Sequence, residues 1–394
     1  MAVSEKVRGF ISQSSWIRKM FEEGARLKKQ FGAENVFDFS IGNPSVEPPI
    51  EFNNALREIA AEEVSGAHGY MPNAGYLETR KVVAQALSAD HGVTLSSDHI
   101  IMTCGAAGAL NVICKVLLEP GDELLAPAPC FVEYRIYADN ANGVAKFIRT
   151  KDDFSLDLAA MRDAIGERTK IVLINSPNNP TGKVYDEASI RGLADMLEDR
   201  CRAHGKDIYL VSDEPYREIV YDGVTVPSIL SAYRNSIIAS SYSKSLSLAG
   251  ERIGYLAVNP AISDVEDVIG GLVLFNRTLG FVNAPALMQR VVAKIHGVTV
   301  DVEEYRRKRE LLCEGLSSIG YEFIKPDGTF YLFPKAPGGD DLEFVKALTQ
   351  RKILTVPGSG FAWPGNFRIA FCVDDATIVN SMKGFEETIR EFRQ

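Results

Sequence analysis

Lys244 stands in a run of small, hydroxyl-bearing and apolar residues, which is an unusual setting for an amine. The run reads Ser-Ser-Tyr-Ser-Lys-Ser-Leu-Ser-Leu-Ala-Gly over residues 240–250, and the lysine is its only charged residue. Most lysines are solvated surface groups. Burial disfavours the charged form of an amine, lowers its pKa and makes it nucleophilic, as Schiff-base chemistry requires. Lys244 is therefore a candidate nucleophile.

Two polar motifs follow apolar, strand-like runs. Asp213 lies in Ser-Asp-Glu-Pro-Tyr at 212–216, where a buried carboxylate is costly unless it is paired. It could cap a helix, join a salt bridge or balance a buried cation. Asn179 lies in Asn-Ser-Pro-Asn-Asn-Pro-Thr-Gly at 175–182, which could be a rigid turn or a ligand loop at a strand's C-terminal end. Its amide could donate to a phenolate-type oxygen.

A third motif, Gly105-Ala106-Ala107-Gly108, joins an apolar strand to a helix. Small side chains let the backbone N–H groups of a helix N-terminus reach an anion, so the motif is either a phosphate seat or a tight turn. It matches neither GxGxxG nor the P-loop pattern, so a nucleotide-binding fold is not favoured. Arg368 lies in the apolar run 366–371, either on a solvent-facing edge strand or as a bidentate clamp for a carboxylate.

Strand-like and helical patterns alternate through the middle of the chain, and this alternation predicts a three-layer α/β fold with a mostly parallel sheet. The expected strands are 99–104, 123–126, 145–149, 170–175, 208–212, 236–240 and 253–258, and the expected helices include 107–118, 158–164 and 187–202.

The chain is longer than one core usually supports, so we expect two domains. Residues 51–285 form the large one and 286–394 a smaller α+β domain, to which the segment 1–50 returns. In that segment Ser14 and Ser15 precede a helical pattern, and 38–41 is a short strand candidate. The smaller domain is expected to hold a long helix over 286–316, strands at 321–324 and 329–333, and a last helix over 376–392.

The ordered motifs resemble the class I and II aminotransferases of pyridoxal-phosphate (PLP) fold type I, the aspartate-aminotransferase-like branch. The similarity runs from about Phe39 to Phe371, and five motifs in the right order and spacing are specific where each alone is weak. The resemblance implies a PLP enzyme that transfers an amino group between an L-amino acid and a 2-oxo acid by a ping-pong mechanism, with the aspartate/glutamate type among the candidates.

The resemblance also implies roles, with Lys244, Asp213 and Tyr216 as catalytic residues. Lys244 forms the Schiff base with PLP and shuttles a proton, and Asp213 keeps the pyridine nitrogen protonated. Asn179 and Tyr216 bind the ring's 3′ oxygen. The remaining cofactor contacts are Gly105, Ala106, Ala107, Ser241 and Arg252 at the phosphate, and Phe131 stacked on the ring.

The substrate side is implied in the same way. Arg368 and Asn179 bind the substrate carboxylate, and Gly42 with Asn43 belongs to a segment that closes over it. Tyr70 resembles a tyrosine that reaches the phosphate of a neighbouring subunit, which implies a homodimer with shared active sites. Thr79 stands where the family usually has Leu, and Asn283 matches an asparagine near the cofactor.

Composition excludes other classes of protein. A net charge of −9 argues against nucleic-acid binding. Scattered histidines and cysteines predict no metal site, and the six cysteines are expected to be reduced thiols. No apolar run approaches the length of a membrane span, and residues 1–10 lack a signal-peptide core. We therefore expect a cytoplasmic protein without nucleic-acid or membrane partners.

Substrate side-chain specificity stays open. Arg277 is the candidate cation for a second carboxylate or a surface residue, whereas Phe281 and Phe330-Tyr331 leave room for an apolar substrate. A PLP lyase, decarboxylase or synthase would share every cofactor contact. A non-enzymatic regulator on this fold would need an appended DNA-binding domain, for which the sequence before Trp16 leaves no room.

Overall fold

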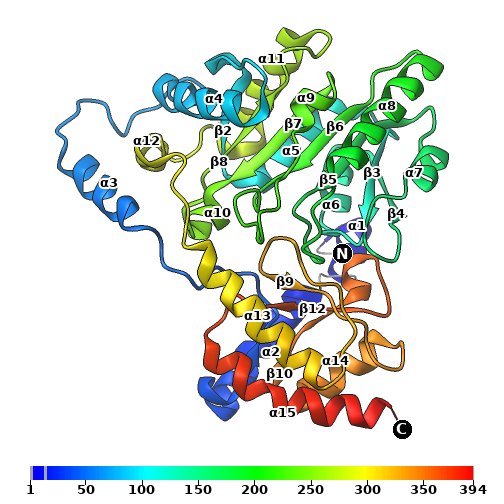
Figure 1. Cartoon of the computed structure of the whole chain (residues 1–394). Coiled ribbons are helices and arrows are strands. Elements are labelled where there is room, and N and C mark those ends of the chain that lie inside the picture. Colours follow the sequence, from blue (N-terminus) through cyan, green and yellow to red (C-terminus); the bar gives the residue numbers. More distant parts are fainter. Residues whose placement is uncertain (1–2, 13–15, 394) are drawn as a thin grey trace.

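The computed structural model describes residues 3–12 and 16–393, and its centre is a seven-stranded sheet (Figure 1). The strand order is β2-β8-β7-β6-β5-β3-β4, and β8 alone runs in the direction opposite to the other strands. This confirms the mostly parallel sheet. The strands are β2 Ile100–Thr103, β3 Glu123–Ala128, β4 Val144–Arg149, β5 Thr169–Asn175, β6 Tyr209–Asp213, β7 Ser236–Ser241 and β8 Gly254–Val258.

Helices cover both faces of this sheet, which gives the expected three layers. Along β5, Val172 and Ile174 pack into one core, and Ile171 and Leu173 pack into another, because alternate side chains of a strand point to opposite faces. The first core includes residues of α3 Ile50–Ala61, α4 Leu77–His91, α7 Leu158–Ala164, α8 Glu187–His204, α9 Ile229–Ala232 and α12 Ala286–Ile295. The second includes residues of α5 Gly105–Leu117, α6 Tyr134–Asn140 and α11 Val265–Asn276.

A second body packs around its own aromatic core and occupies the lower part of Figure 1. The N-terminal segment joins it, because β1 Phe37–Asp38 pairs in parallel with β10 Ile353–Leu354. A three-stranded antiparallel sheet has the order β11-β12-β9, with β11 Val356–Pro357, β12 Phe367–Ala370 and β9 Tyr331–Leu332. The helices are α2 Trp16–Phe31, α13 Val302–Ser318, α14 Asp341–Gln350 and α15 Asp375–Phe392.

The short helices complete the described chain. They are α1 Glu5–Ser12, α10 Tyr242–Ser245, the 3₁₀ turns Ala33–Asn35, Ser97–His99, Ala249–Glu251 and Gly358–Phe361, and the π-helical turn Arg277–Phe281. No helix in residues 3–12 and 16–393 is long and apolar enough to cross a membrane. All six cysteines are free thiols, as expected.

Three local predictions were wrong. The stretch 286–316 is two helices, because Gly297 adopts a φ of 91° and Asp301 caps a new start by accepting from the backbone N–H of Glu303. Residues 321–324 form no strand, since Tyr321 instead continues from α13 with its N–H bonded to the Leu316 carbonyl. The strand expected at 38–41 is Phe37–Asp38. Ser14 and Ser15 lie outside the described residues.

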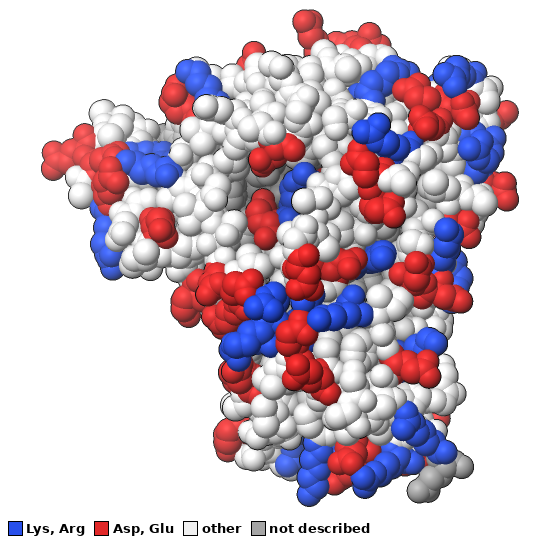
Figure 2. Space-filling view, in the orientation of Figure 1, with Lys and Arg blue, Asp and Glu red and all other residues white. Residues whose placement is uncertain are grey.

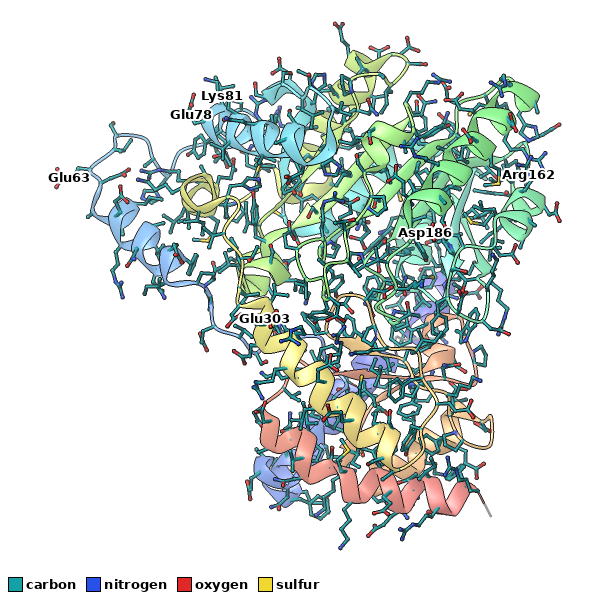
Figure 3. The ribbon with its side chains drawn as sticks, viewed as in Figure 1. Glu63, Glu78, Lys81, Arg162, Asp186 and Glu303 are labelled. Carbon is teal, nitrogen blue, oxygen red and sulfur yellow. The ribbon has the colours of Figure 1, made fainter. Side chains whose placement is uncertain are left out.

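Charged side chains cap helices and cover their exposed faces. Asp186 caps α8 by accepting a 2.7 Å bond from the Ser189 N–H, and Glu303 lies in the first turn of α13 (Figure 3). Both negative charges interact favourably with the positive end of the helix dipole. Lysines and arginines are interspersed with aspartates and glutamates over the face in Figure 2.

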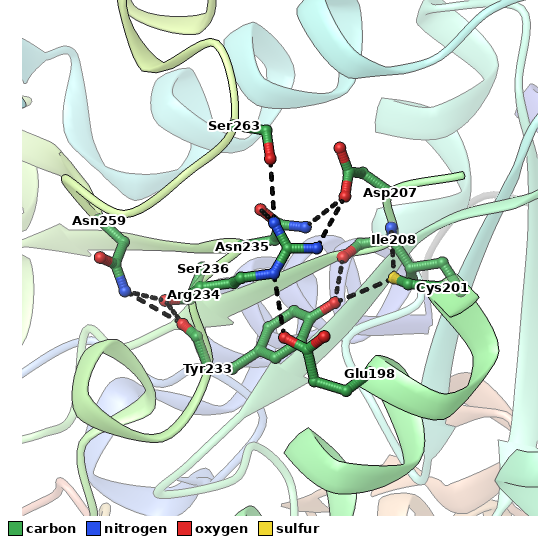
Figure 4. A network of polar contacts seen from close by, with 10 residues as sticks. All are labelled: Glu198, Cys201, Asp207, Ile208, Tyr233, Arg234, Asn235, Ser236, Asn259 and Ser263. Atoms are coloured by element: carbon green, nitrogen blue, oxygen red, sulfur yellow. Dashed lines mark hydrogen bonds and ion pairs between the residues drawn. The ribbon is translucent and has the colours of Figure 1, made fainter. Parts of the chain in front are cut away.

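A polar network around Arg234 fixes the end of the sheet away from the candidate site (Figure 4). The guanidinium donates to Glu198 on α8 at 3.1 Å, to Asp207 before β6 at 3.2 Å and to Ser263 after β8 at 2.9 Å. Asn235 also donates to Asp207, at 2.8 Å. The network joins the starts of β6 and β7 to the helix that connects β5 to β6.

Candidate active site

A cavity of about 300 Å³ opens at the carboxyl ends of β5, β6 and β7, where open α/β sheets bind ligands. It is not the largest hollow: one of about 890 Å³ lies between α2 and α14, but none of the predicted site residues lines it. The smaller cavity brings together most of the predicted residues, namely Gly42, Ala106, Ala107, Phe131, Asn179, Asp213, Tyr216, Ser241, Lys244, Arg252 and Arg368.

Lys244 projects into this cavity from α10, the short helix that follows β7. Its Nζ donates to the Gly42 carbonyl at 2.5 Å and lies 5.5 Å from the Phe330 ring centre. Burial lowers the pKa of this amine to about 8; the Cys372 thiol opposes the shift and the Arg368 guanidinium adds to it. No carboxylate in the described chain forms an ion pair with it, so the neutral amine is readily populated.

Asp213 ends β6 with its carboxylate buried in the wall of the cavity. Oδ2 accepts a 2.7 Å bond from the Tyr134 hydroxyl, whereas Oδ1 is buried without a partner in the described chain. Burial raises the pKa of this carboxyl to about 7, and the bond from Tyr134 opposes that rise. An orphaned carboxylate oxygen is costly, and a cationic donor in the cavity would satisfy it.

Asn179 is held by both its backbone and its side chain. Its N–H donates to Oδ1 of Asn175 at 2.7 Å, and its own Oδ1 accepts from Nη1 of Arg368 at 3.0 Å. The Nδ2 amide therefore remains as the donor toward the cavity. Across the cavity, the Tyr216 hydroxyl lies 3.0 Å from that of Tyr331, which sequence reasoning did not place beside it.

The Gly105 turn places a cation at the N-terminus of α5. Gly105 has a φ of 73°, and a Cβ there would lie 2.6 Å from Nη2 of Arg252, so this position requires glycine. Arg252 donates to the Ala249 carbonyl at 2.8 Å and to the Cys104 carbonyl at 3.3 Å. With Ala106, Ala107 and Ser241 also lining the cavity, free N–H groups, a guanidinium and a hydroxyl converge as an anion requires.

Arg368 lies on β12, the central strand of its sheet, and only 1% of its surface is exposed. The solvent-facing edge position is therefore wrong. Nη2 donates to the Ser40 carbonyl at 2.7 Å, and the guanidinium carbon lies 4.4 Å from the Tyr331 ring centre. Its Nε is buried without a partner, and the described residues offer it no carboxylate. A buried, unpaired guanidinium is suited to an anionic ligand.

Some predicted residues do not line the cavity. Tyr70 is 94% exposed on the segment that joins α3 to α4. Asn283 donates to the Pro72 carbonyl at 3.0 Å, and exposed Arg277 begins the π-helical turn. Asn43 and Phe281 are also outside the lining. Gly105 is outside it too, but it lies next to the guanidinium of Arg252, which does line the cavity.

Sequence reasoning missed Tyr134 and Tyr137, assigned no role to Asn175, and expected Tyr331 only as an aromatic residue beside the substrate. Tyr134 and Tyr137 follow Phe131 at helical spacing and come from α6, while Asn175 ends β5 and Tyr331 begins β9. The spacing of Phe131, Tyr134 and Tyr137 was the available signal, since residues three apart share a helix face. Nothing in the sequence marked Tyr331 as a hydrogen-bonding group.

Comparisons with known proteins agree with this geometry. The chain is 35% identical over 340 residues to a probable aspartate aminotransferase of Methanocaldococcus jannaschii, covering 85% of this chain and 88% of that protein. The crystal structure of an amino transferase from Eubacterium rectale has a TM-score of 0.96 and 40% identity, with both chains covered completely.

Aspartate aminotransferase from Thermus thermophilus, solved with maleate, has a TM-score of 0.87 and 26% identity, covering 98% of this chain and 100% of that one. The family model "Aminotransferase class I and II" matches residues 34–384. This chain therefore belongs to the class I and II aminotransferase family.

Proposed function

We propose that the enzyme uses PLP to transfer an amino group between an L-amino acid and a 2-oxo acid in a ping-pong reaction. The observation that best supports this proposal is that two complementary groups line one cavity. They are the Lys244 amine, with its lowered pKa, and the unpaired Oδ1 of Asp213. An amine that can be neutral at working pH can attack an aldehyde, and an orphaned carboxylate oxygen can hold a protonated ring nitrogen.

The residues present fit PLP at each of its polar groups. The aldehyde would meet Lys244, and the ring nitrogen would meet Asp213. The phenolic oxygen would accept from Asn179 Nδ2 and the Tyr216 hydroxyl. The phosphate would lie at the N-terminus of α5 beside Arg252, where a Cβ on Gly105 would leave no room for the guanidinium. When bound, PLP supplies an electron sink for the carbanion formed at the substrate Cα.

The chain's own residues then have distinct tasks. Neutral Lys244 Nζ takes the proton from the substrate Cα, since its lowered pKa leaves a lone pair available. Asp213 would hold the proton on the ring nitrogen, and the 2.7 Å bond from Tyr134 favours the ionised carboxylate. Phe131 would stack on the ring, and the Ser241 hydroxyl would donate to the phosphate.

Arg368 would bind the substrate α-carboxylate. Its guanidinium lies in the cavity wall with one unsatisfied nitrogen, while its bonds to Asn179 and Ser40 fix its plane. A fixed, planar guanidinium binds a carboxylate at two points and so orients the Cα–H bond toward Lys244. Gly42 and Asn43 belong to the segment that closes over the bound substrate.

We propose amino acids of the aspartate/glutamate type as substrates, because this chain is similar to aspartate aminotransferases. Among described lining residues the cations are Lys244, Arg252 and Arg368, and each already has a task. A second substrate carboxylate therefore needs a cation from beyond this lining, for which Arg277 is the candidate. Assays with aspartate, glutamate, aromatic and aliphatic amino acids test this; failure of both dicarboxylates would refute it.

We further propose a cytoplasmic homodimer with shared active sites. Tyr70 is 94% exposed, and α3 with the loop after it extends from the side of the sheet layer (Figure 1). A large aromatic so exposed on an extended arm suits a second copy whose phosphate site it would reach. We place the domain boundaries at 1–50, 51–285 and 286–394. Light scattering of the purified protein would test the dimer.

The proposed chemistry is tested by absorbance. Purified protein with PLP should show a visible band that changes on adding the right amino acid and is absent in Lys244→Ala. Incubation with an amino acid alone separates this reaction from a lyase: a transaminase stops after one equivalent of 2-oxo acid, whereas a lyase continues to turn over. Continued turnover without an amino acceptor would refute aminotransfer.

A further inference from the structure

One buried tyrosine touches three parts of the site at once. Tyr331 is 2% exposed on β9, and its hydroxyl lies 3.0 Å from that of Tyr216. The Arg368 guanidinium lies over its ring at 4.4 Å. Gly42 lies against the same hydroxyl so closely that an added Cβ would overlap it. Tyr331 thus lies between the proposed cofactor contact, the proposed carboxylate site and the closing segment.

The protons of the two hydroxyls can be assigned by counting. Each tyrosine has one O–H to donate, and in the cofactor-free chain either tyrosine could be the donor in the 3.0 Å bond. If Tyr216 gives its only proton to the cofactor's phenolic oxygen, it can only accept from Tyr331. The bond between the tyrosines must then run from the Tyr331 O–H to the Tyr216 oxygen.

We propose that Tyr331 is a positioning residue that, by donating to Tyr216, turns the Tyr216 proton toward the cofactor's phenolic oxygen. This inference rests on the proposed function. A hydroxyl that accepts a hydrogen bond becomes a stronger donor, because bonds in a chain polarise one another. With PLP bound, its phenolic oxygen would be better stabilised as an anion, and the nitrogen joined to Lys244 would lose its proton at a lower pH.

Burial around the pair makes this orientation effective. Both rings are buried, and they meet edge to face with centroids 5.7 Å apart and planes at 78°. Tyr216 also packs edge to face on Phe330, at 5.6 Å and 85°. With both rings fixed, each hydroxyl proton has few positions available, and Gly42 covers the Tyr331 side.

Tyr331→Phe tests the proposal because it removes the hydroxyl and keeps the ring on which Arg368 rests. We expect the pH midpoint of the visible-band titration of the PLP-loaded protein to rise by about 0.3 to 1 unit. Tyr321→Phe is the matched control: it removes another buried hydroxyl, which donates to the Phe385 carbonyl at 3.0 Å in the second body. That variant should keep the wild-type midpoint.

A double variant excludes a merely structural effect. In a Tyr216→Phe background, Tyr331→Phe should cause no further shift, because its route to the cofactor is gone. An unchanged midpoint in Tyr331→Phe alone, or an equal shift with and without Tyr216, would overturn the inference. Either result leaves the proposed function intact, whereas absence of a Lys244-dependent band in the wild-type protein would refute that function itself.

Discussion

The Tyr134 hydroxyl donates to one oxygen of Asp213 and leaves the other oxygen, Oδ1, buried and unpaired in the wall of the cavity. This single bond opposes the effect of burial, which by itself favours the neutral acid. Tyr134 therefore increases the ionised fraction of Asp213 near neutral pH.

Tyr134→Phe should weaken cofactor binding at pH 7 by about tenfold, since a hydrogen bond to a charged group is worth about 1.5–3 kcal/mol. Loss of the bond raises the pKa of Asp213 further above its usual range, so the deficit should shrink as pH rises and the carboxylate ionises. PLP titrations from pH 6 to 9 would measure it. Tyr137→Phe, on the same helix, is the control, and equal affinities for both variants at every pH would contradict the prediction.

The lowered pKa of Lys244 predicts how fast cofactor-free protein captures PLP. With a pKa of about 8, about a tenth of the amine is neutral at pH 7 and about half at pH 8. The capture rate should therefore rise with pH and level off near pH 9. Stopped-flow absorbance would follow it; a rate that rises about tenfold between pH 8 and pH 9 would indicate an ordinary lysine.

The same lysine should destabilise the cofactor-free protein. Its folded pKa lies below the unfolded value, so the penalty is fully present below about pH 8 and disappears as pH rises toward 10.5. Lys244→Met should accordingly stabilise the protein at pH 7 by up to about 3 kcal/mol, less the lost bond to Gly42. Urea unfolding measures this, with exposed Lys335→Met as the control; no gain at pH 7 would refute the penalty.

Two glycines on α5 differ in whether their position tolerates a side chain, and alanine substitutions at both would test the anion site. Gly105→Ala forces a side chain into the left-handed region and against Arg252, so we expect about 1–3 kcal/mol of destabilisation and a large loss of PLP affinity. Gly108→Ala meets its nearest neighbour at 3.6 Å, an ordinary contact, and should retain both properties. Equal effects of the two substitutions on affinity would argue against an anion site at this turn.

Arg368→Lys keeps the charge but loses the fork of donors. We expect kcat/KM for the amino acid to fall about 100-fold while PLP affinity stays within about twofold, because a lysine cannot bind a carboxylate at two points. Steady-state kinetics and PLP titration measure the two effects. A parallel loss of both would place Arg368 at the cofactor instead of at the substrate.

The long buried elements were predictable because their patterns are local. Every predicted strand of the central sheet was found within a few residues, and 158–164 matches α7 at both ends. The errors fell where a local signal was overridden: Gly297 interrupts a helical pattern, and Tyr321 is satisfied by contacts with α13 and Phe385 instead of a strand partner. Short apolar runs do not reveal such partners.

The site was partly predictable for a related reason. Lys244 and Asp213 are recognisable in the sequence because each is a charged residue next to small or apolar residues. Tyr134 and Tyr331 do not, because each acts through a partner 79 or 115 positions away in the chain. A tyrosine in an apolar stretch looks like core until its hydroxyl is placed in space.

The bonds from Lys244 to Gly42 and from Arg368 to Ser40 join residues 202 and 328 positions apart. The ribosome therefore makes the whole central sheet, and the amine on its edge, long before Arg368 exists. Until the polypeptide has been synthesised through β12, the Ser40 carbonyl has no Arg368 guanidinium from which to accept a hydrogen bond. A nascent chain can thus fold its main layer early and acquire a competent catalytic pocket only near the end of translation.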